Sequence, residues 1–479
     1  MSDHHKTPTL IDAIIPIIVL IIMLSVSVYL YGDNSSYGAN QIALILSASI
    51  GAIIAIKNGY SWKEVESGIV KGIGMGMRAI LILLAVGALI GTLIMSGTVP
   101  AMIFYGLDIL SPSFFYFTAC VICAISSISI GSSWTVAGTL GVALMGIATG
   151  LGLSPSVTAG AIISGAYFGD KMSPLSDTTN LAPAIAGTDL FSHIRHMAWT
   201  TGPSLLIALV IFLIMGLTTN AEGNAEGLEM IQSTLNQTFN ISIISFIPII
   251  VIFVLAYKRM PAFPTILIGA LLAGLFSILL QPEVVSNFVN QPELSSALTM
   301  ISGVWTALHS GFILESGVPV VDDLLTRGGM ASMLNTIWLV VCALTFGAVL
   351  ETAQLLHKIV EKVLIFANST GSLIVTTIAT CIGINIIAAD QYIAIVLPGR
   401  MYRAEFKRRK LAARNLSRAL EDSGTITSPL IPWNTCGAYM SASLGIATFS
   451  YVPYCFFNLV NPVIAIIYAL AKVKIIKNN

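Results

Sequence analysis

Long apolar runs alternate with short polar segments along almost the whole chain. A helix that crosses a membrane needs about 20 mainly apolar residues, and eleven segments approach or reach that length. They are residues 10–31, 39–57, 79–97, 114–130, 134–150, 197–217, 241–257, 262–281, 335–352, 371–389 and 452–473. Four weaker or interrupted candidates are 155–169, 297–318, 390–400 and 436–450. The pattern predicts an all-α, polytopic membrane protein with about 11–14 transmembrane or re-entrant helices.

Composition supports this prediction and argues against other classes of protein. Hydrophobic residues fill 56% of the 479 positions and charged residues 10%, against about 25% charged in an ordinary soluble domain. The formal net charge is zero, which argues against a nucleic-acid partner. The run 10–31 is too long for a signal peptide and no cleavage site follows it, so it should be the first span. We expect the lipid bilayer as its surroundings and no cofactor.

Lysine and arginine positions predict the orientation, because basic loops remain in the cytoplasm. Loops 32–40 and 218–240 contain no Lys or Arg and should be outside, whereas segment 57–78 is basic and should be inside. The strongest signal is the dense basic run 400–418, which should be a cytoplasmic loop. Such a run could also bind anionic lipid or nucleic acid, but topology is the simpler interpretation. The chain is therefore predicted to be a multi-pass protein of the cytoplasmic membrane.

Two stretches of the chain resemble each other, and their surroundings cross the membrane in opposite senses. Residues 173–180 and 428–435 both open with Ser-Pro-Leu, and both follow acidic residues. Basic flanks direct the apolar run 79–97 outward and the matching run 335–352 inward. Inverted-topology repeats of this kind are typical of several secondary-transporter folds. The predicted units are an N-terminal hairpin at 1–70, a first repeat at 71–217, connecting helices and extracytoplasmic loops at 218–330, and a second repeat at 331–479.

The richest intramembrane polar segment surrounds Pro174, which forbids a continuous helix and frees backbone carbonyls. Ser173 and Pro174 together are a good start signal for a new helix. Beyond them, Asp177, Thr178 and Asn180 offer hard oxygen ligands that suit Na⁺. Asp177 is the leading candidate, although it could simply cap a helix. Asp170 is a second candidate, although it could instead form a solvated pair with Lys171 at the cytoplasmic edge.

Asp390 is the main candidate in the second half, because it lies between apolar runs and well before the basic segment. The alternative is a helix-end carboxylate near the interface. Ser428 and Asn434 mirror the first cluster and could complete a pseudo-symmetric cage, or could only hydrogen-bond between helices. Ser132 lies in a segment that begins with glycine and is rich in hydroxyl side chains, where a helix should break. This segment corresponds to the Asp390 region of the second half. Transported Na⁺ is therefore expected mainly at Asp177 and Asp390.

The residues quoted above also resemble a known family. The run 169–180, GDKMSPLSDTTN, is similar to the signature of the NhaC-type sodium/proton antiporters, which belong to the ion-transporter superfamily of inverted-repeat carriers. Gly131-Ser-Ser-Trp134 and the second Ser-Pro-Leu segment also resemble sequence segments of this family. The resemblance extends over about residues 70–470. It implies exchange of Na⁺ for H⁺, with broken helices meeting near the membrane centre and alternating access between the two sides.

Three alternatives follow from the same residues. Carriers with this scaffold also exchange organic acids such as malate and lactate, or amino acids, but no clear membrane-embedded Arg is expected here to clamp a carboxylate. An intramembrane aspartyl protease would need Gly where this chain has Tyr167, so we expect a transporter and not an enzyme. A channel is disfavoured by the broken helices. The sequence leaves a monomer and a homodimer equally open.

Overall fold

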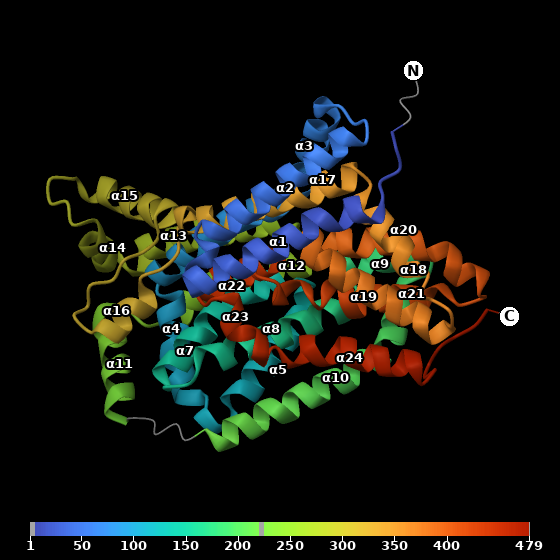
Figure 1. The fold of residues 1–479 in the computed structure, drawn as a ribbon. Coiled ribbons are helices and arrows are strands. Elements are labelled where there is room, and N and C mark those ends of the chain that lie inside the picture. The colour runs from blue at the N-terminus through green and yellow to red at the C-terminus, as the bar shows by residue number, and fades with distance from the viewer. Residues whose placement is uncertain (1–4, 220–224, 479) are drawn as a thin grey trace.

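The structure is a computed structural model that describes residues 5–219 and 225–478. Within these ranges the only regular elements besides helices are two isolated β-bridges, Phe312 with Arg327 and Leu411 with Lys477. Figure 1 shows long helices that run roughly alongside one another, with both chain ends at the same end of the molecule. The all-α prediction is confirmed.

The helices begin and end as follows. The α-helices are α1 (Leu10–Tyr31), α2 (Ala39–Lys57), α3 (Trp62–Met95), α4 (Thr98–Ile109), α5 (Phe115–Ile130), α6 (Ser133–Val136), α7 (Val142–Gly150), α8 (Pro155–Met172), α9 (Asp177–Ala186), α10 (Leu190–Thr218), α11 (Ala225–Thr238), α12 (Ile247–Tyr257), α13 (Ala262–Leu280), α14 (Pro282–Val289), α15 (Ser296–His309), α16 (Pro319–Leu325), α17 (Leu334–Thr352), α18 (Leu355–Leu364), α19 (Thr370–Ala388), α20 (Gln391–Arg408), α21 (Ala413–Leu420), α22 (Thr435–Leu444), α23 (Thr448–Tyr451) and α24 (Phe456–Leu470). Shorter 3₁₀ turns are Gly32–Ser36, Pro112–Phe114, Ile243–Phe246, Met330–Met333, Ser428–Leu430 and Val452–Tyr454, and π-helical turns are Ala137–Gly141 and Glu421–Thr425.

Nine helical segments in the described ranges are long and apolar enough to cross a membrane, or up to eleven if each sharply bent pair is one span. The bent pairs are α11 with α12, which turn by 90°, and α23 with α24, which turn by 57°. The sequence predicted about 11–14 crossings or re-entrant segments, and nine or more long apolar helices in the described ranges agree with a polytopic membrane protein. Shorter helices such as α22, which is largely buried, are not in this count.

Helix α3 is much longer than the predicted span at 79–97. It begins at Trp62, where Ser61 and Glu64 form a capping box that satisfies both backbone N–H groups. The predicted cytoplasmic loop over 57–78 is therefore wrong in its boundary, because most of it is the first four turns of α3. Hydropathy alone marks the apolar part of a helix and misses the charged turns that extend beyond it.

A glycine seam joins α3 to α17. Gly68, Gly72 and Gly76 recur every four residues, which places them on one face of α3. A Cβ atom added to Gly72 would lie 2.3 Å from the Cβ of Ala348, and one added to Gly68 would lie 2.0 Å from the Oγ1 of Thr352. Small residues at successive turns let helix backbones approach closely, which is a common packing mode in membranes. The seam therefore fixes α3 and α17 at short range over about two turns.

The basic run 400–418 is not a loop. It forms the C-terminal part of α20 and most of α21, and Arg418 is almost completely buried. Hydrogen bonds from Arg408, and then Arg409, lower the pKa of Glu405 to about 2. Arg409 also donates to the carbonyls of Ala367 and Ser369, so it ties the end of α20 to the segment between α18 and α19. The loop was predicted wrongly because hydropathy cannot distinguish a charged helix from a loop.

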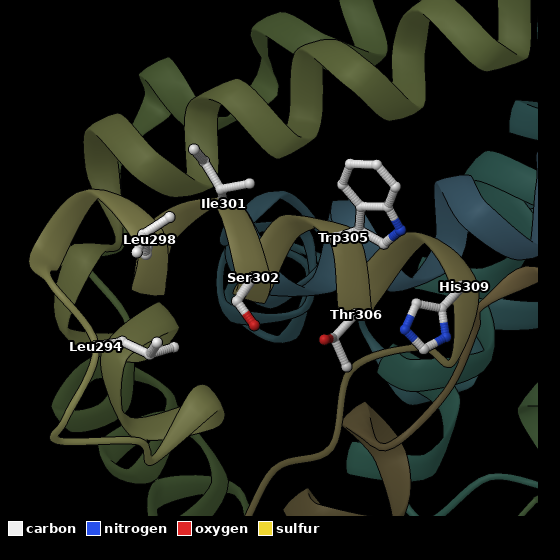
Figure 2. Close-up of a pocket in the computed structure, with 7 residues that line it drawn as sticks. All are labelled: Leu294, Leu298, Ile301, Ser302, Trp305, Thr306 and His309. Carbon is white, nitrogen blue, oxygen red and sulfur yellow. The ribbon is translucent and has the colours of Figure 1, made fainter.

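The opposite end of the molecule is built by α11, α14, α15 and α16 (Figure 1). The sequence predicted a loop at 218–240, but α11 occupies most of it, while residues 220–224 lie outside the described residues. Figure 2 shows a pocket along α15 that is lined by Leu294, Leu298, Ile301, Ser302, Trp305, Thr306 and His309. None of the predicted site carboxylates lines this pocket.

Candidate functional site

The first helix break lies between α8 and α9. Helix α8 ends at Met172, and α9 begins at Asp177 with Ser176 as its N-cap. The prediction that Ser173 and Pro174 start the new helix was therefore wrong by three residues. Asn180 donates to the carbonyls of Pro174 at 2.9 Å and Ser176 at 2.7 Å, so its amide holds the turn closed. The break itself, predicted from the proline, is present.

A second break, between α5 and α6, docks on the first. Gly131 ends α5 with a φ of 75°, a left-handed conformation that favours glycine. A Cβ atom at Gly131 would lie 2.6 Å from the Cβ of Leu175 and 2.9 Å from the backbone nitrogen of Ser176. Ser132 then caps α6 and accepts hydrogen bonds from the backbone and hydroxyl of Thr135. Only a glycine lets the two broken segments approach this closely.

Asp170 lies where these two breaks meet. Its Oδ2 accepts hydrogen bonds from the hydroxyl of Ser133 at 2.7 Å and from the Ser133 backbone nitrogen at 3.2 Å. The side chain is half-buried, not solvated, and it makes no ion pair with Lys171. The alternative interpretation of a solvated Asp170–Lys171 pair at the cytoplasmic edge is therefore wrong. Close packing of α8 on α5, with Gly169 against the Ala124 carbonyl, holds Asp170 in place.

The second half has a matching break between α19 and α20. Ala389 adopts a left-handed conformation with a φ of 57°, and Asp390 follows as the N-cap of α20. Asp390 is 7% exposed, and its Oδ1 accepts from the backbone nitrogens of Tyr392 at 2.9 Å and Ile393 at 3.1 Å. The carbonyl of Ala389 accepts from the Thr435 backbone nitrogen at 3.0 Å, which joins this break to the start of α22. Asp390 is thus a buried cap with one oxygen engaged by the helix.

Ser428 and Asn434 make interhelical and capping hydrogen bonds. Asn434 caps α22 through the Cys436 nitrogen, and its amide donates to the carbonyl and side-chain oxygens of Asn385. Ser428 donates to the Thr425 carbonyl in its own turn at 2.7 Å, and its hydroxyl also lies 3.4 Å from the Gln391 side-chain oxygen on α20. The contacts to Asn385 and Gln391 are of the interhelical kind that the alternative interpretation describes. The pseudo-symmetric cage remains a prediction.

The predicted carboxylates belong to two breaks whose helices pack together. Asp170 lies at the first break, Asp177 begins α9 after it, Asp390 caps α20, and α9 packs against α20. Asp177 is exposed in the first turn of α9, and Thr178 beside it is buried with its hydroxyl 3.2 Å from that of Ser176. In residues 5–219 and 225–478 no three His, Cys, Asp or Glu side chains are close enough to hold a metal ion together. A bound cation would therefore rely on hydroxyl and carbonyl oxygens besides its carboxylates.

An aromatic contact joins the two halves beside these carboxylates. The rings of Trp134 and Tyr439 stack with their centroids 4.1 Å apart and their planes 13° from parallel. The Tyr439 hydroxyl donates to the carbonyl of Trp134 at 2.7 Å. Trp134 follows the first-half break and Tyr439 lies on α22, so the contact fixes the first break against the second-half helices.

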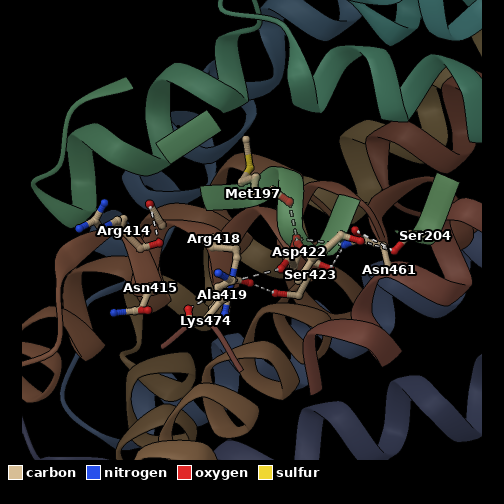
Figure 3. Close-up of polar contacts among 12 residues, drawn as sticks. Met197, Ser204, Arg414, Asn415, Arg418, Ala419, Asp422, Ser423, Asn461 and Lys474 are labelled. Carbon is tan, nitrogen blue, oxygen red and sulfur yellow. Dashed lines mark hydrogen bonds and ion pairs between the residues drawn. The ribbon is translucent and has the colours of Figure 1, made fainter. Parts of the chain in front are cut away.

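Sequence reasoning missed a buried charge network around Asp422. The side chains of Lys171 and Asp422 are 0% and 1% exposed and form an ion pair. The same Asp422 oxygen accepts from the Thr200 hydroxyl at 3.0 Å and from the Asn461 amide at 3.1 Å. Figure 3 shows Asp422 and Asn461 side by side, with Arg418 on the other side of the acid. The signal available in the sequence was the charged pair Asp170-Lys171 in an otherwise uncharged stretch. Lys171 and its partner Asp422, however, are 251 residues apart.

Two histidines are also buried near this network. His193 and His196 lie in the first turns of α10, which begins at Leu190, and both side chains are buried. His193 lies 2.8 Å from the hydroxyl of Ser417, because the first turns of α10 pack against α21. Arg418 is 2% exposed and its Nε lies 3.9 Å from Asp422, so this buried arginine faces an acid of the protein itself.

Comparison with known proteins gives the family. Residues 165–473 match the Na⁺/H⁺ antiporter family. An Na⁺/H⁺ antiporter NhaC of Alkalihalophilus pseudofirmus is 37% identical over 427 residues, which cover 89% of this chain and 88% of that protein. A malate-2H⁺/Na⁺-lactate antiporter of Bacillus subtilis is 36% identical and covers 97% of this chain and 95% of its own. An arginine/ornithine antiporter of Halobacterium salinarum is 35% identical, with coverage of 97% and 92%.

These relatives are transporters, and the apolar helices described above are those of a multi-pass membrane protein. The resemblance to NhaC-type antiporters that the motifs indicated is thereby confirmed. The chain belongs to the Na⁺/H⁺ antiporter family.

Proposed function

We propose that this protein exchanges Na⁺ for H⁺ across the cytoplasmic membrane and that Asp170 is the principal Na⁺ ligand. The observation that carries the proposal is the position of Asp170 at the junction of two broken helices, hydrogen-bonded to Ser133, in a chain of this family. Asp177 begins α9 and Asp390 caps α20, and these two helices pack against each other. The exposed side chain of Asp177 is where a cation arriving from water first meets negative charge.

The ligand chemistry suits a small hard cation. Only one oxygen of Asp170 accepts hydrogen bonds from Ser133, so the other can face a cation. Breaks in membrane helices supply hydroxyl and carbonyl oxygens that can replace the water shell of Na⁺. Burial disfavours an ionised acid while a nearby bound cation favours it, so protonation of a buried acid near the Na⁺ site and Na⁺ binding oppose each other. That opposition is the basis of exchange.

The basic end of the molecule gives the orientation and the driving force. Helices α18, α20 and α21 lie at the end that also carries both termini (Figure 1), which the positive-inside rule assigns to the cytoplasm. Rocking of one half against the other would then expose the site to each side in turn. If the exchange moves net charge, the membrane potential contributes about 2.3 kcal/mol per charge per 100 mV.

Inorganic cations are favoured over organic substrates because the buried basic side chains are already paired with an acid of the protein. A carboxylate substrate needs a positive partner, but Lys171 pairs with Asp422 and Arg418 lies beside the same acid. Relatives named for malate, lactate, arginine and ornithine share the scaffold, so these compounds belong in the test.

The test uses purified protein in vesicles with a trapped pH dye and an imposed proton gradient. NaCl, malate, lactate and amino acids are added separately. We expect prompt dequenching with NaCl alone, its loss in Asp170→Asn, and its retention in Asp189→Asn, which removes an exposed acid. A response that needs an organic substrate, or full activity in Asp170→Asn, would contradict the proposal.

A further inference from the structure

Glu421 is a buried acid that no part of the site described above uses. It is the first residue of the π-helical turn Glu421–Thr425, between α21 and the second Ser-Pro-Leu segment, and it is 0% exposed. Neither of its carboxyl oxygens has a hydrogen-bond partner among the described residues, and the Thr425 hydroxyl in the same turn has none either. An ionised carboxylate in that state loses its hydration without compensation, whereas a protonated one loses far less.

The neighbouring Asp422 shows the opposite arrangement. Its Oδ1 accepts from Lys171, Thr200 and Asn461, while its Oδ2 has no hydrogen-bond partner in the part of the chain that the structure describes and lies 3.9 Å from the Arg418 Nε. Two positive side chains therefore compensate an ionised carboxylate here, and none of the ion pairs between described residues includes Glu421. Two adjacent acids in one turn thus have environments that suit opposite protonation states. Pairs of titratable groups whose surroundings differ in this way commonly divide the roles of charge and proton carrier between them. Asp422 is the charged member, and Glu421 is the member suited to hold a proton.

The surrounding groups come from several elements. The charged or titratable side chains around the turn are Asp170 and Lys171 on α8, His193 and His196 on α10, Cys381 on α19, Arg418 on α21 and Asp422 in the turn itself. Helices α19, α20 and α24 otherwise contact the turn through uncharged groups, such as the Asn385 amide on the Gly424 carbonyl and the Asn461 amide on Asp422. The Lys171–Asp422 ion pair thus involves the residue next to Glu421, and Asp170 precedes Lys171 on α8.

Charge balance then links the two sites. Lys171 and Arg418 carry two positive charges, while Asp422, Asp170 and Glu421 carry three negative charges when all are ionised. One added positive charge makes the cluster neutral, and it can be Na⁺ at Asp170 or H⁺ at Glu421. Either ion disfavours the other through the low-dielectric interior, without sharing a ligand.

We infer that Glu421 is the proton-binding site of the exchange, separate from the Na⁺ site at Asp170. This inference rests on the proposed Na⁺/H⁺ exchange. When Na⁺ binds at Asp170, the Glu421 carboxyl O–H bond breaks, the proton leaves to water, and the carboxylate keeps the electron pair. When Na⁺ leaves, a proton from the other side restores the neutral acid.

The test compares wild type with Glu421→Gln, which is close in shape and mimics the protonated acid. Two fluxes are measured in vesicles: proton movement driven by Na⁺, and exchange of labelled Na⁺ for unlabelled Na⁺, which needs no proton. We expect the variant to lose Na⁺-driven proton movement by about 100-fold, as removal of a proton-transferring group does. Na⁺/Na⁺ exchange should persist at saturating Na⁺, with a higher Na⁺ concentration for half-maximal exchange, because the neutral glutamine mimics the proton that disfavours Na⁺. Glu361→Gln, at an exposed acid paired with Lys358, should change neither flux.

Each outcome decides one point. Wild-type vesicles without Na⁺-driven proton movement would remove the proposed function itself. Wild-type coupling that persists in Glu421→Gln, or loss of both fluxes in a folded variant, would overturn the role of Glu421 alone. If the variant does not fold, infrared difference spectra of the wild type decide. The C=O band of a protonated carboxyl should disappear when Na⁺ is added, and an unchanged band would overturn the inference.

Discussion

Breaking the buried pair of Lys171 and Asp422 should destabilise the protein strongly. Both side chains are essentially unexposed, and the Asp422 oxygen that meets Lys171 also accepts from Thr200 and Asn461. Truncating one member of such a pair leaves a buried charge without its partner, which costs about 3–5 kcal/mol. We therefore expect a loss of this size in Lys171→Met and a similar loss in Asp422→Asn.

The assay is reversible unfolding in mixed micelles followed by tryptophan fluorescence, and the double variant is the decisive measurement. Removing both charges leaves neither Lys171 nor Asp422 unpaired, while Arg418 loses its acid equally in Asp422→Asn and in the double variant. The double variant should therefore be more stable than the sum of the single losses predicts, by about 1–3 kcal/mol. Lys358→Met, in the exposed pair with Glu361, should change stability by under about 1 kcal/mol. Single losses as small as that of Lys358→Met, or losses that simply add, would refute the reasoning.

Three further predictions address the breaks and the basic end. Gly131→Ala should disrupt folding or abolish transport, because the new methyl would overlap the neighbouring turn at a φ of 75°; expression and flux measure it. Ser133→Ala removes the 2.7 Å hydrogen bond to Asp170, worth about 1.5–3 kcal/mol to a charged acceptor, so the Na⁺ concentration for half-maximal flux should shift about ten-fold or more. Glu405→Gln removes an acid whose pKa Arg408 holds at about 2. This folded pKa lies below the unfolded value of about 4.3, so ionised Glu405 stabilises the fold at neutral pH and loses that effect as pH falls toward 2. The melting curves of wild type and Glu405→Gln should therefore converge near pH 2.

Matched controls separate these effects from general damage. Gly74→Ala meets nothing within 4 Å and should leave expression and transport unchanged. Ser129→Ala, at an exposed serine that only bonds its own helix, should keep the wild-type Na⁺ dependence. A Gly131 variant with normal flux, an unshifted Ser133 variant, or a Glu405 variant whose stability deficit grows at acidic pH would each contradict the corresponding structural argument.

The sequence predicted the helical membrane fold and the helix breaks because both depend on local chemistry. A run of about twenty apolar residues favours a membrane-spanning helix, and a proline interrupts a helix. Both effects are independent of where the rest of the chain lies. The break at Pro174 is present for this reason, although Ser176 and not Ser173 caps the next helix. Asp170 and Asp390 were also identified locally, since acids between apolar runs are rare. Their roles as Na⁺ ligands stay predictions.

What the sequence could not predict depends on distant partners. Lys171 looked like an interfacial base because its only nearby acid in sequence is Asp170, yet its partner Asp422 belongs to the other half. The packing of α10 on α21 likewise buries His193, although the charged Arg195 lies two residues away in sequence. Helix ends were misjudged where charged turns extend a span, as at the start of α3. Inverted repeats stay a prediction as well.

The glycine seam between α3 and α17 has a mechanical consequence for a transporter. Lipid gives helices no hydrophobic reason to associate, so this contact depends on van der Waals attraction, which falls off steeply with separation. Parting the seam would forfeit that attraction along its whole length, and sliding it would drive Leu344 or Thr352 into a backbone with no room for a methyl group. The two helices therefore act as a stationary pivot. Motion during a transport cycle should be sought in the segments around it, where the helices are already broken.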